Sequence, residues 1–338
     1  MTARTAAEVL GWSRELVTPT LRAAIDALPG SVRRIAGYHF GWWDADGGST
    51  GADADSGKAL RPALVLLAAT AAGSAPEPAV PAAVAVELVH NFSLLHDDVM
   101  DADTTRRHRP TVWTVFGIPA AILAGDALLA LAFDVIAATG HPVSQVALRG
   151  LSGAVQELVV GQVSDVEFER RTDVTLAECV RMAEGKTAAL IGQSCALGAQ
   201  FGNATPARAA NLYRFGDRMG LAFQLADDLL GIWGDPSVTG KPVFSDLCSR
   251  KKSLPVVAAI NAGTREAAEL AELYHSPAAL DLAHTADLID SCGGRAWCQT
   301  TADELLAEAL RHLAAVRPAA PAEDELTGLA RLATRRDH

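Results

Sequence analysis

Residues 94–110 read Leu-Leu-His-Asp-Asp-Val-Met-Asp-Ala-Asp-Thr-Thr-Arg-Arg-His-Arg-Pro and follow a largely apolar segment. If this segment is helical, Asp97 and Asp101 lie one turn apart on the same face, with about 5–6 Å between their Cβ atoms. Two unpaired carboxylates that close together repel each other and resist ionisation. Mg²⁺ removes the conflict, since proteins typically hold it with one or two carboxylates plus substrate phosphates. Arg106 and Arg107 follow shortly after, so the stretch indicates a diphosphate site, with an exposed acidic helix end as the alternative.

A second acidic pair, Asp227 and Asp228, closes another apolar helical segment, and Lys241 follows a short loop later. The core of a helical bundle is a known place for carboxylate metal sites contributed by facing helices. One such pair is weak evidence. Two pairs, each followed by basic residues, predict a metal site shared between two helices.

The composition favours helices over sheets. The 338 residues are 49% hydrophobic but only 5% aromatic, and Val, Ile and Thr seldom alternate between turn signals. We therefore predict an all-α protein, built as a single large helical bundle over residues 1–338. The segment 44–56 is rich in Asp, Gly and Ser and is expected to be a mobile loop.

Charge and cysteine usage exclude several classes of protein. The net charge of −11 argues against a nucleic-acid partner and against an anionic membrane surface. Five cysteines without metal-ligand spacing are typical of reduced thiols in a cytosolic protein. The sequence also shows no signal segment and no long apolar run without a breaker or a charge. We expect a cytoplasmic protein without stable membrane insertion.

Several different short motifs follow one another along much of the chain. The first acidic stretch matches a DDxxD motif, followed by an Arg pair. Further motif residues are Gly57-Lys58-Ala59-Leu60-Arg61-Pro62, His90, Gly161-Gln162 with Asp165, Lys186-Thr187, Gln224, and Lys251-Lys252-Ser253-Leu254-Pro255. With these motifs the chain resembles the trans-isoprenyl diphosphate synthases, or polyprenyl synthetases, from about residue 57 to about residue 255. One departure is Gly231, where the second acidic motif of that family normally ends in Asp.

The resemblance implies a fold, an activity and a cofactor. The fold is the isoprenoid synthase bundle with a central metal-lined cavity, and the active form is a homodimer. The reaction condenses isopentenyl diphosphate with an allylic diphosphate, with Mg²⁺ as cofactor, about three ions in each active site. Loss of diphosphate leaves an allylic carbocation, which the double bond of isopentenyl diphosphate attacks. The pocket must be dry, since water would quench the cation.

The same resemblance assigns residue roles. The direct metal ligands are Asp97, Asp101 and Asp227; the allylic diphosphate is bound by Arg106, Lys186, Lys241 and Lys251; isopentenyl diphosphate is bound by Lys58, Arg61, His90 and Arg107; and Thr187 and Gln224 offer oxygens to the carbocation. Lys186 lies in an Ala-rich helical segment, where a buried amine is costly unless an anion pairs with it. The substrate diphosphate is the expected anion.

Gly231 leaves the second cluster one carboxylate short. Since Asp227 is retained, we expect metal binding to survive with weaker affinity. Asp235, one turn further on, is a partial substitute only if the helix continues to it.

Product length is expected to depend on Phe92, five residues before Asp97 and about 7–8 Å away along a helix axis. Ser93 beside it is too small to block a growing chain. In the resembling family a lone aromatic at this position goes with a C20 product, so we predict geranylgeranyl diphosphate, with farnesyl diphosphate (C15) second. The alternative is that Phe92 simply packs between helices.

Two other functions remain open. A class I terpene cyclase shares the fold and the first motif, but residues 227–231 do not fit its second metal motif. A cyclase also leaves the four residues assigned to isopentenyl diphosphate without a role. A non-catalytic subunit of a heteromeric synthase tends to lose the acidic motifs, which this chain largely keeps.

Overall fold

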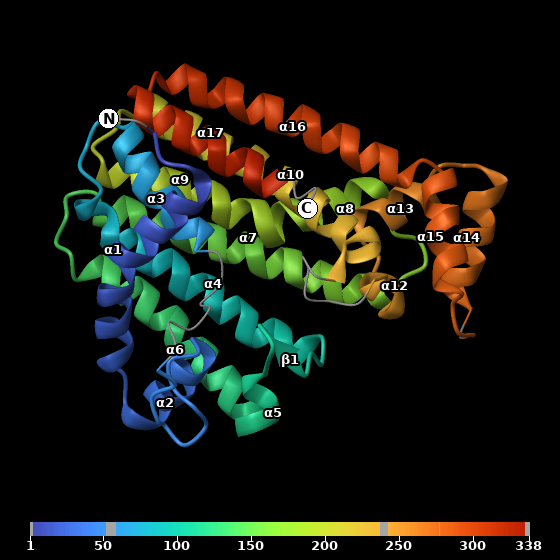
Figure 1. Ribbon diagram of the computed structural model, residues 1–338, viewed down its shortest axis with the longest axis horizontal. Coiled ribbons are helices and arrows are strands. Elements are labelled where there is room, and N and C mark those ends of the chain that lie inside the picture. The colour runs from blue at the N-terminus through green and yellow to red at the C-terminus, as the bar shows by residue number, and fades with distance from the viewer. Residues whose placement is uncertain (1–2, 52–58, 237–242, 277, 335–338) are drawn as a thin grey trace. The chain divides into compact units, whose positions relative to one another are not determined.

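The computed structural model describes residues 3–51, 59–236, 243–276 and 278–334 (Figure 1). Lys58 and Lys241, both expected in the site, lie outside these residues. The regular secondary structure of the described residues is helical, apart from one short hairpin and an isolated bridge between Trp43 and Ser49. The prediction of an all-α protein is confirmed.

The contacts divide the chain into two compact units. Unit 1 holds residues 1–153, 193–213 and 314–328, and unit 2 holds residues 154–192, 214–313 and 329–338. Five helices contribute residues to both units: α7 (Ser144–Arg170), α9 (Ala189–Phe201), α10 (Pro206–Trp233), α16 (Gly294–Val316) and α17 (Ala320–Thr334). The single domain expected from the sequence stays a prediction.

The core of unit 1 is formed by the two helices α3 (Leu60–Ala71) and α4 (Val80–Met100), which are buried on nearly all sides. Its other elements are α1 (Ala6–Asp26), α2 (Gly30–His39), η1 (Glu77–Ala79), β1 (Thr105–Arg106), β2 (Arg109–Pro110), α5 (Val112–Phe116) and α6 (Ile118–Ala137). Helix α4 packs against α3 and α6 (Figure 1), and its apolar residues are buried on every face as far as Leu95. A largely apolar helix that is buried on every face is a core helix, and the acids of α4 follow this buried part at its C-terminal end.

Two helical segments, Glu77–Met100 and α6, are long and apolar enough to cross a membrane. In the first, 72% of the apolar window is buried inside the protein, against 33% in α6. The mostly buried core helix of a soluble protein passes the same test. These segments are therefore weak evidence for membrane insertion.

Part of the segment expected as a mobile loop forms a hydrogen-bonded turn. The Asp44 side chain accepts hydrogen bonds from the backbone N–H groups of Asp46 (3.0 Å) and Gly48 (2.7 Å). Such bonds from an Asp to the following residues are typical of turns. Residues 52–56 lie outside the described chain.

Unit 2 contains two hydrophobic clusters. Besides the shared helices, its elements are α8 (Leu176–Ala183), the π-helix η2 (Glu184–Ala188), α12 (Ser245–Cys248), α13 (Leu254–Ile260), α14 (Arg265–His275) and α15 (Leu282–Ser291). One cluster joins buried residues of α7, α8, α10, α13 and α16, and the other joins α12 to α15 with the end of α10. The second acidic pair lies on α10 beside the first of these clusters.

Candidate active site

The first acidic cluster lies at the C-terminal end of α4. Asp97 is half-buried and Asp101 is exposed, whereas Asp98 is 1% exposed. The helix persists to the cluster, because the Asp101 N–H still donates to the Asp97 carbonyl at 2.8 Å. Asp97 and Asp101 therefore stand on successive turns of one face, as the spacing predicted.

Asp98 differs from Asp97 and Asp101 in that its side chain is buried and hydrogen-bonded to an arginine. Its Oδ1 accepts a hydrogen bond from Arg106 Nε at 2.5 Å, while its Oδ2 is buried without a partner among the described residues. Burial raises the pKa of Asp98 to about 6, although the charge of Arg106 acts in the opposite direction. Asp98 thus fixes the Arg106 side chain beside the acids of α4.

A hairpin presents the two arginines. Strands β1 and β2 pair Arg106 with Arg109, which leaves Arg107 and His108 as the two turn residues. Both have positive φ, 51° and 60°, as a type I′ turn requires, although neither is glycine. The Arg109 guanidinium donates to the carbonyls of Tyr38 and Trp43, both at 3.1 Å, and so ties the hairpin to the end of α2.

A pocket in unit 1 opens beside this hairpin. Its lining includes Asp98, Arg106, Arg107, Arg109 and His39. Three guanidinium groups around one pocket favour an anionic ligand, because guanidinium binds phosphate with two parallel hydrogen bonds. Two of these arginines were expected to bind diphosphate, and Arg109 was not.

Arg61 and His90, expected to bind isopentenyl diphosphate, lie near each other in unit 1. Burial is the main cause that lowers the pKa of Arg61, to about 10. Burial and the charge of Arg61 together hold the pKa of His90 well below its usual value. Arg61 Nε is buried without a hydrogen-bond partner among the described residues, which leaves a donor for an anion to satisfy.

A buried hydrogen-bond network of Glu87, Asn91 and His39 lies close to the arginines of this site. Asn91 is fully buried and donates to Glu87 Oε1 at 2.8 Å, while its own Oδ1 lies 3.0 Å from His39 Nε2. Because that Asn oxygen can only accept, His39 carries its proton on Nε2. Burial, helped by Arg107 and Arg106, lowers the pKa of His39 to about 3. Burial also raises the pKa of Glu87, against the charges of Arg107 and Arg61.

Phe92, expected to limit product length, is 6% exposed. Its ring meets the His96 ring edge-on at 4.9 Å, and His96 Nε2 lies 3.0 Å from the Ile122 carbonyl on α6. The close approach of the His96 ring to α6 requires glycine at position 125, because a Cβ there would come within 2.4 Å of the ring. Ser93 is half-buried and donates to the His90 carbonyl at 2.8 Å.

The second cluster, on α10 in unit 2, resembles the first in that one acid of the pair is accessible and the next is buried. Asp227 is exposed and Asp228 is 4% exposed. Asp228 accepts from Gln224 Nε2 at 2.7 Å and from the Leu254 N–H at 2.8 Å, and Thr187 donates to Gln224 Oε1 at 2.6 Å. Burial raises the pKa of Asp228 to about 7, against the opposing charge of Lys251. Thr187 and Gln224, both expected to offer oxygens, are thus hydrogen-bonded to each other, and Asp228 fixes the amide of Gln224.

Lys186 projects from the π-helix η2, and its Nζ lies 2.6 Å from Asp165 Oδ2. The expected anion for Lys186 was a diphosphate, but the structure supplies Asp165 of α7 as its partner. The backbones of η2 and α7 touch here, since a Cβ on Gly161 would come within 2.3 Å of the Lys186 nitrogen. Burial acts to raise the pKa of Asp165, yet the charges of Lys251 and Lys186 hold it below its usual value.

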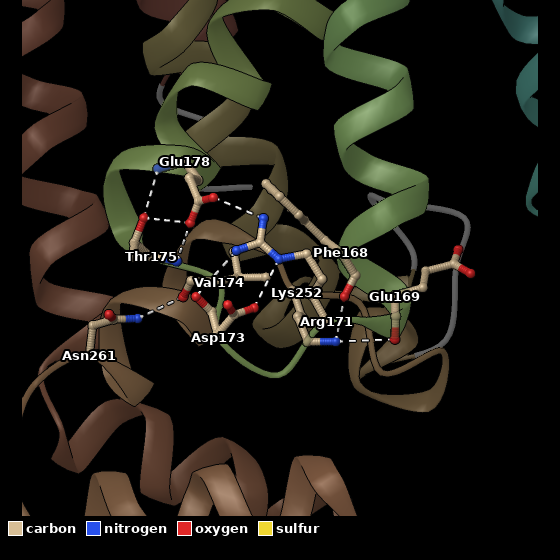
Figure 2. Close-up of polar contacts among 9 residues, drawn as sticks. All are labelled: Phe168, Glu169, Arg171, Asp173, Val174, Thr175, Glu178, Lys252 and Asn261. Atoms are coloured by element: carbon tan, nitrogen blue, oxygen red, sulfur yellow. Dashed lines mark hydrogen bonds and ion pairs between the residues drawn. The ribbon is translucent and has the colours of Figure 1, made fainter.

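Adjacent lysines after α12 have different surroundings. Lys252 Nζ donates to the carbonyls of Phe168 (2.6 Å) and Glu169 (3.3 Å) at the C-terminal end of α7 (Figure 2). A cation is favourable there because carbonyls at a helix end carry partial negative charge. Lys251 is half-buried, and its charge acts on the pKa values of Asp165 and Asp228. Lys252 is therefore an anchor, and Lys251 is the lysine near the acids of unit 2.

The acids of each cluster, taken separately, fit a hard cation that takes part of its coordination from a substrate. The described residues contain no group of three or more His, Cys, Asp or Glu side chains arranged for a metal. Mg²⁺ needs fewer, because it keeps several waters and commonly binds one or two carboxylates together with substrate phosphates. The accessible carboxylates, which are the type of ligand that Mg²⁺ binds, are Asp97, Asp101 and Asp227.

Sequence reasoning missed the supporting residues. Asp98 and Asp228 were visible only as the second acid of each Asp-Asp pair. The available signal for their burial was the largely apolar segment that precedes each pair. Nothing in the spacing pointed to His39, Asn91 or Arg109 as a group, because the contacts of Asn91 with His39 and of Arg109 with Tyr38 join residues that are distant in sequence. The helix α10 ends at Trp233, so the condition under which Asp235 was to replace the side chain absent at Gly231 is not met.

Comparison with known proteins gives consistent matches. The polyprenyl synthetase family model matches residues 52–289. A (2E,6E)-farnesyl diphosphate synthase of Mycobacterium tuberculosis is 49% identical over 334 residues, covering 96% of this chain and 92% of that protein. A geranylgeranyl diphosphate synthase of the same species is 48% identical over 323 residues, covering 94% and 91%. The crystal structure of a polyprenyl synthetase from Streptomyces coelicolor A3(2) matches with a TM-score of 0.92 and 46% identity, covering 97% of this chain and 99% of that one.

Proposed function

The chain belongs to the polyprenyl synthetase family, and we propose that it condenses isopentenyl diphosphate with an allylic diphosphate. The observation that carries this proposal is the end of α4, where outward-facing Asp97 and Asp101 adjoin a hairpin that presents Arg106 and Arg107. Metal-binding acids beside phosphate-binding bases are what a diphosphate substrate needs.

The proposed cofactor is Mg²⁺, bound by Asp97, Asp101 and Asp227, with about three ions in each active site as the family resemblance implies. When bound, it neutralises the negative charge that develops on the departing diphosphate. Members of this family use a divalent metal. The Mg²⁺ identity and the number of ions are part of the proposal.

The cationic side chains are proposed to divide the two diphosphates. Arg106, Lys186 and Lys251 bind the allylic diphosphate, and Arg107, Arg61 and His90 bind isopentenyl diphosphate, joined by Lys241 and Lys58 respectively. Because His90 is held neutral, it contributes a hydrogen bond and no charge. The paired positions of Arg106 with Asp98 and of Lys186 with Asp165 support a site arranged before the substrate arrives.

In the proposed reaction the allylic C–O bond breaks and its electron pair leaves with the diphosphate. The double bond of isopentenyl diphosphate attacks the carbocation, and the departing diphosphate takes the proton that is then lost. The oxygens of Thr187 and Gln224 face the cation and stabilise its charge. Their mutual hydrogen bond, backed by Asp228, fixes where those oxygens lie.

We propose geranylgeranyl diphosphate as the product, with farnesyl diphosphate as the second candidate. Overall similarity does not separate them, since relatives named for each product are 48% and 49% identical to this chain. Phe92 is buried on α4 as a floor residue would be, yet its contact with His96 equally fits a packing residue. The Phe92→Ala variant separates the two: a floor residue gives longer products, whereas a packing residue costs about 3–5 kcal/mol of stability with product length unchanged.

The decisive experiment is incubation of the protein with isopentenyl diphosphate and each of dimethylallyl, geranyl and farnesyl diphosphate, with and without Mg²⁺, followed by product analysis. Elongated allylic diphosphates that require Mg²⁺ support the proposal. Cyclic hydrocarbons formed without isopentenyl diphosphate would indicate a cyclase, and no turnover in folded protein would indicate a non-catalytic subunit. The Asp97→Ala and Asp101→Ala variants should remain folded and lose more than about nine-tenths of turnover.

We further propose a cytoplasmic homodimer that inserts in no membrane. Ile118, Ile122 and Leu123 on α6 have exposed fractions of 48%, 39% and 62%, which supports a protein partner for this apolar face. Size-exclusion chromatography with light scattering distinguishes a dimer from a monomer.

A further inference from the structure

His96 connects the face of α4 that carries Phe92 to helix α6. Phe92 and His96 are four residues apart on α4, so they share a face of the helix. Their rings meet edge to face, with 4.9 Å between the centroids and 70° between the planes. His96 directly precedes Asp97 in the chain, and about one and a half helical turns separate Phe92 from Asp97. The contact therefore lies between the buried Phe92 and the acidic end of α4.

Two features of α6 fix the position of the His96 ring. Its Nε2 lies 3.0 Å from the Ile122 carbonyl, and because a carbonyl only accepts, that nitrogen carries the proton. The ring lies against Gly125, where an added Cβ would come within 2.4 Å of Nε2 and 2.5 Å of Cδ2. Asp126 Oδ1 is 3.7 Å from the same nitrogen, too far for a hydrogen bond, so the carbonyl is the partner. One turn of α6 thus determines where the ring lies.

We propose that His96 is a positioning residue that sets product length by fixing the Phe92 ring. The inference rests on the proposed function and extends the determinant of product length from α4 to α6. Gly125 leaves room for the His96 ring, and the Ile122 carbonyl binds it. The ring in turn restricts the rotamers of Phe92, because packed side chains leave each other few alternatives. A floor residue needs this restriction, since a ring that moves between rotamers stops chain growth at no single length.

Two single substitutions perturb the arrangement from its two helices. His96→Ala removes the ring, whereas Gly125→Ala keeps both aromatic side chains and displaces the His96 ring, because the added methyl group takes its place. In both variants Phe92 loses its fixed position, so we expect the ratio of longer to shorter prenyl products to rise by about threefold or more. The matched control is Gly153→Ala, another glycine within a helix, where a Cβ meets nothing within 4 Å. This control should keep the product ratio of the wild type.

Double variants test whether the effect passes through the proposed contacts. The three atoms nearest to a Cβ at position 125 all belong to His96, so in the His96→Ala background Gly125→Ala has no ring to displace. The double variant should therefore give the product ratio of His96→Ala alone. In the Phe92→Ala background His96 has no floor residue to hold, so adding His96→Ala should leave the ratio unchanged. Independent, additive effects in either pair would overturn the proposal.

Each full-length variant is incubated with isopentenyl diphosphate, dimethylallyl diphosphate and Mg²⁺, and the products are separated by chain length and identified by mass spectrometry. Far-UV circular dichroism and thermal unfolding establish that each variant is folded. The rate at which isopentenyl diphosphate is consumed is measured in the same incubations. A substitution that only disturbs Asp97 slows this rate and leaves the product ratio unchanged, so that result in His96→Ala would refute the positioning role.

The same measurements distinguish failure of this inference from failure of the proposed function. If the wild type consumes no isopentenyl diphosphate, the proposed function fails and the inference fails with it. If the wild type elongates its substrate and the folded His96→Ala and Gly125→Ala variants keep its product ratio, the proposed function stands. His96 then only packs α4 against α6.

Discussion

Asp227 and Asp228 are neighbours in sequence with opposite environments. The first is exposed on α10, and the second is buried and accepts hydrogen bonds from Gln224 and from the Leu254 N–H. Asp97 and Asp98 on α4 show the same contrast, with Arg106 as the partner of Asp98. In each cluster one acid reaches solvent, where a metal can bind, and the next holds a side chain of the candidate site in place.

This contrast predicts different effects of two adjacent substitutions. Asp227→Ala should abolish most turnover and change the free energy of unfolding by less than about 0.5 kcal/mol, as surface substitutions usually do. Asp228→Ala leaves the buried Leu254 N–H and the half-buried Gln224 amide without their acceptor and should destabilise the protein by about 1–3 kcal/mol. Urea unfolding and steady-state turnover of both variants check this. Equal stability of the two variants would refute the positioning role of Asp228.

His39 predicts a pH dependence of stability. Its pKa is about 3 in the folded protein, against about 6.5 in the unfolded chain. Below pH 6.5 the unfolded chain takes up a proton that the folded protein does not, so folding stability falls as the pH falls from 6.5 toward 3. Relative to His39→Gln, whose amide can donate to Asn91 without titrating, the wild type should lose up to about 1.4 kcal/mol per pH unit. Parallel unfolding free energies of the two proteins between pH 7 and 4.5 would contradict this.

At the scale of elements, the segment after α10 is held by its own side chains. Arg250 precedes the lysine pair and has φ of 54°, a left-handed conformation that favours glycine. Its guanidinium donates to the carbonyls of Leu273 (2.9 Å) and Tyr274 (3.4 Å) at the end of α14, and to the carbonyl of Ala278 after it. The arginine therefore combines a strained backbone with hydrogen bonds that attach this loop to the segment at the end of α14.

Two substitutions at this position separate strain from attachment. Arg250→Ala loses the hydrogen bonds and keeps the strained backbone, whereas Arg250→Gly loses the same bonds and relieves the strain. Arg250→Gly should therefore be more stable than Arg250→Ala by about 1 kcal/mol. Urea unfolding of both variants measures the difference. An alanine variant as stable as the glycine variant would mean that the backbone at 250 carries no strain.

At the scale of the whole molecule, five helices belong to both compact units. Because the residues of one helix are linked by continuous backbone hydrogen bonds, a unit cannot unfold without breaking helices that the other unit uses. We therefore expect one cooperative thermal transition, detected at the same midpoint by far-UV circular dichroism and by calorimetry. Two separate transitions would show that the units are independent domains and would overturn the single-domain prediction.

The sequence by itself determined the fold class and the candidate chemistry. Helical periodicity and composition are local properties, and they indicated an all-α chain. The acidic pairs at the ends of apolar segments indicated metal and diphosphate, because carboxylates four residues apart on a helix must share a face.

Only the tertiary structure decided which polar groups meet. Lys186 pairs with Asp165, 21 positions away, and Asn91 pairs with His39, 52 positions away. No periodicity in the sequence links either pair. The same holds for burial: Asp227 and Asp228 look alike in the sequence, and their surroundings differ because one faces solvent and the other packs against α13. Local patterns specify which face of a helix is apolar, whereas the partners on that face depend on how distant segments fold together.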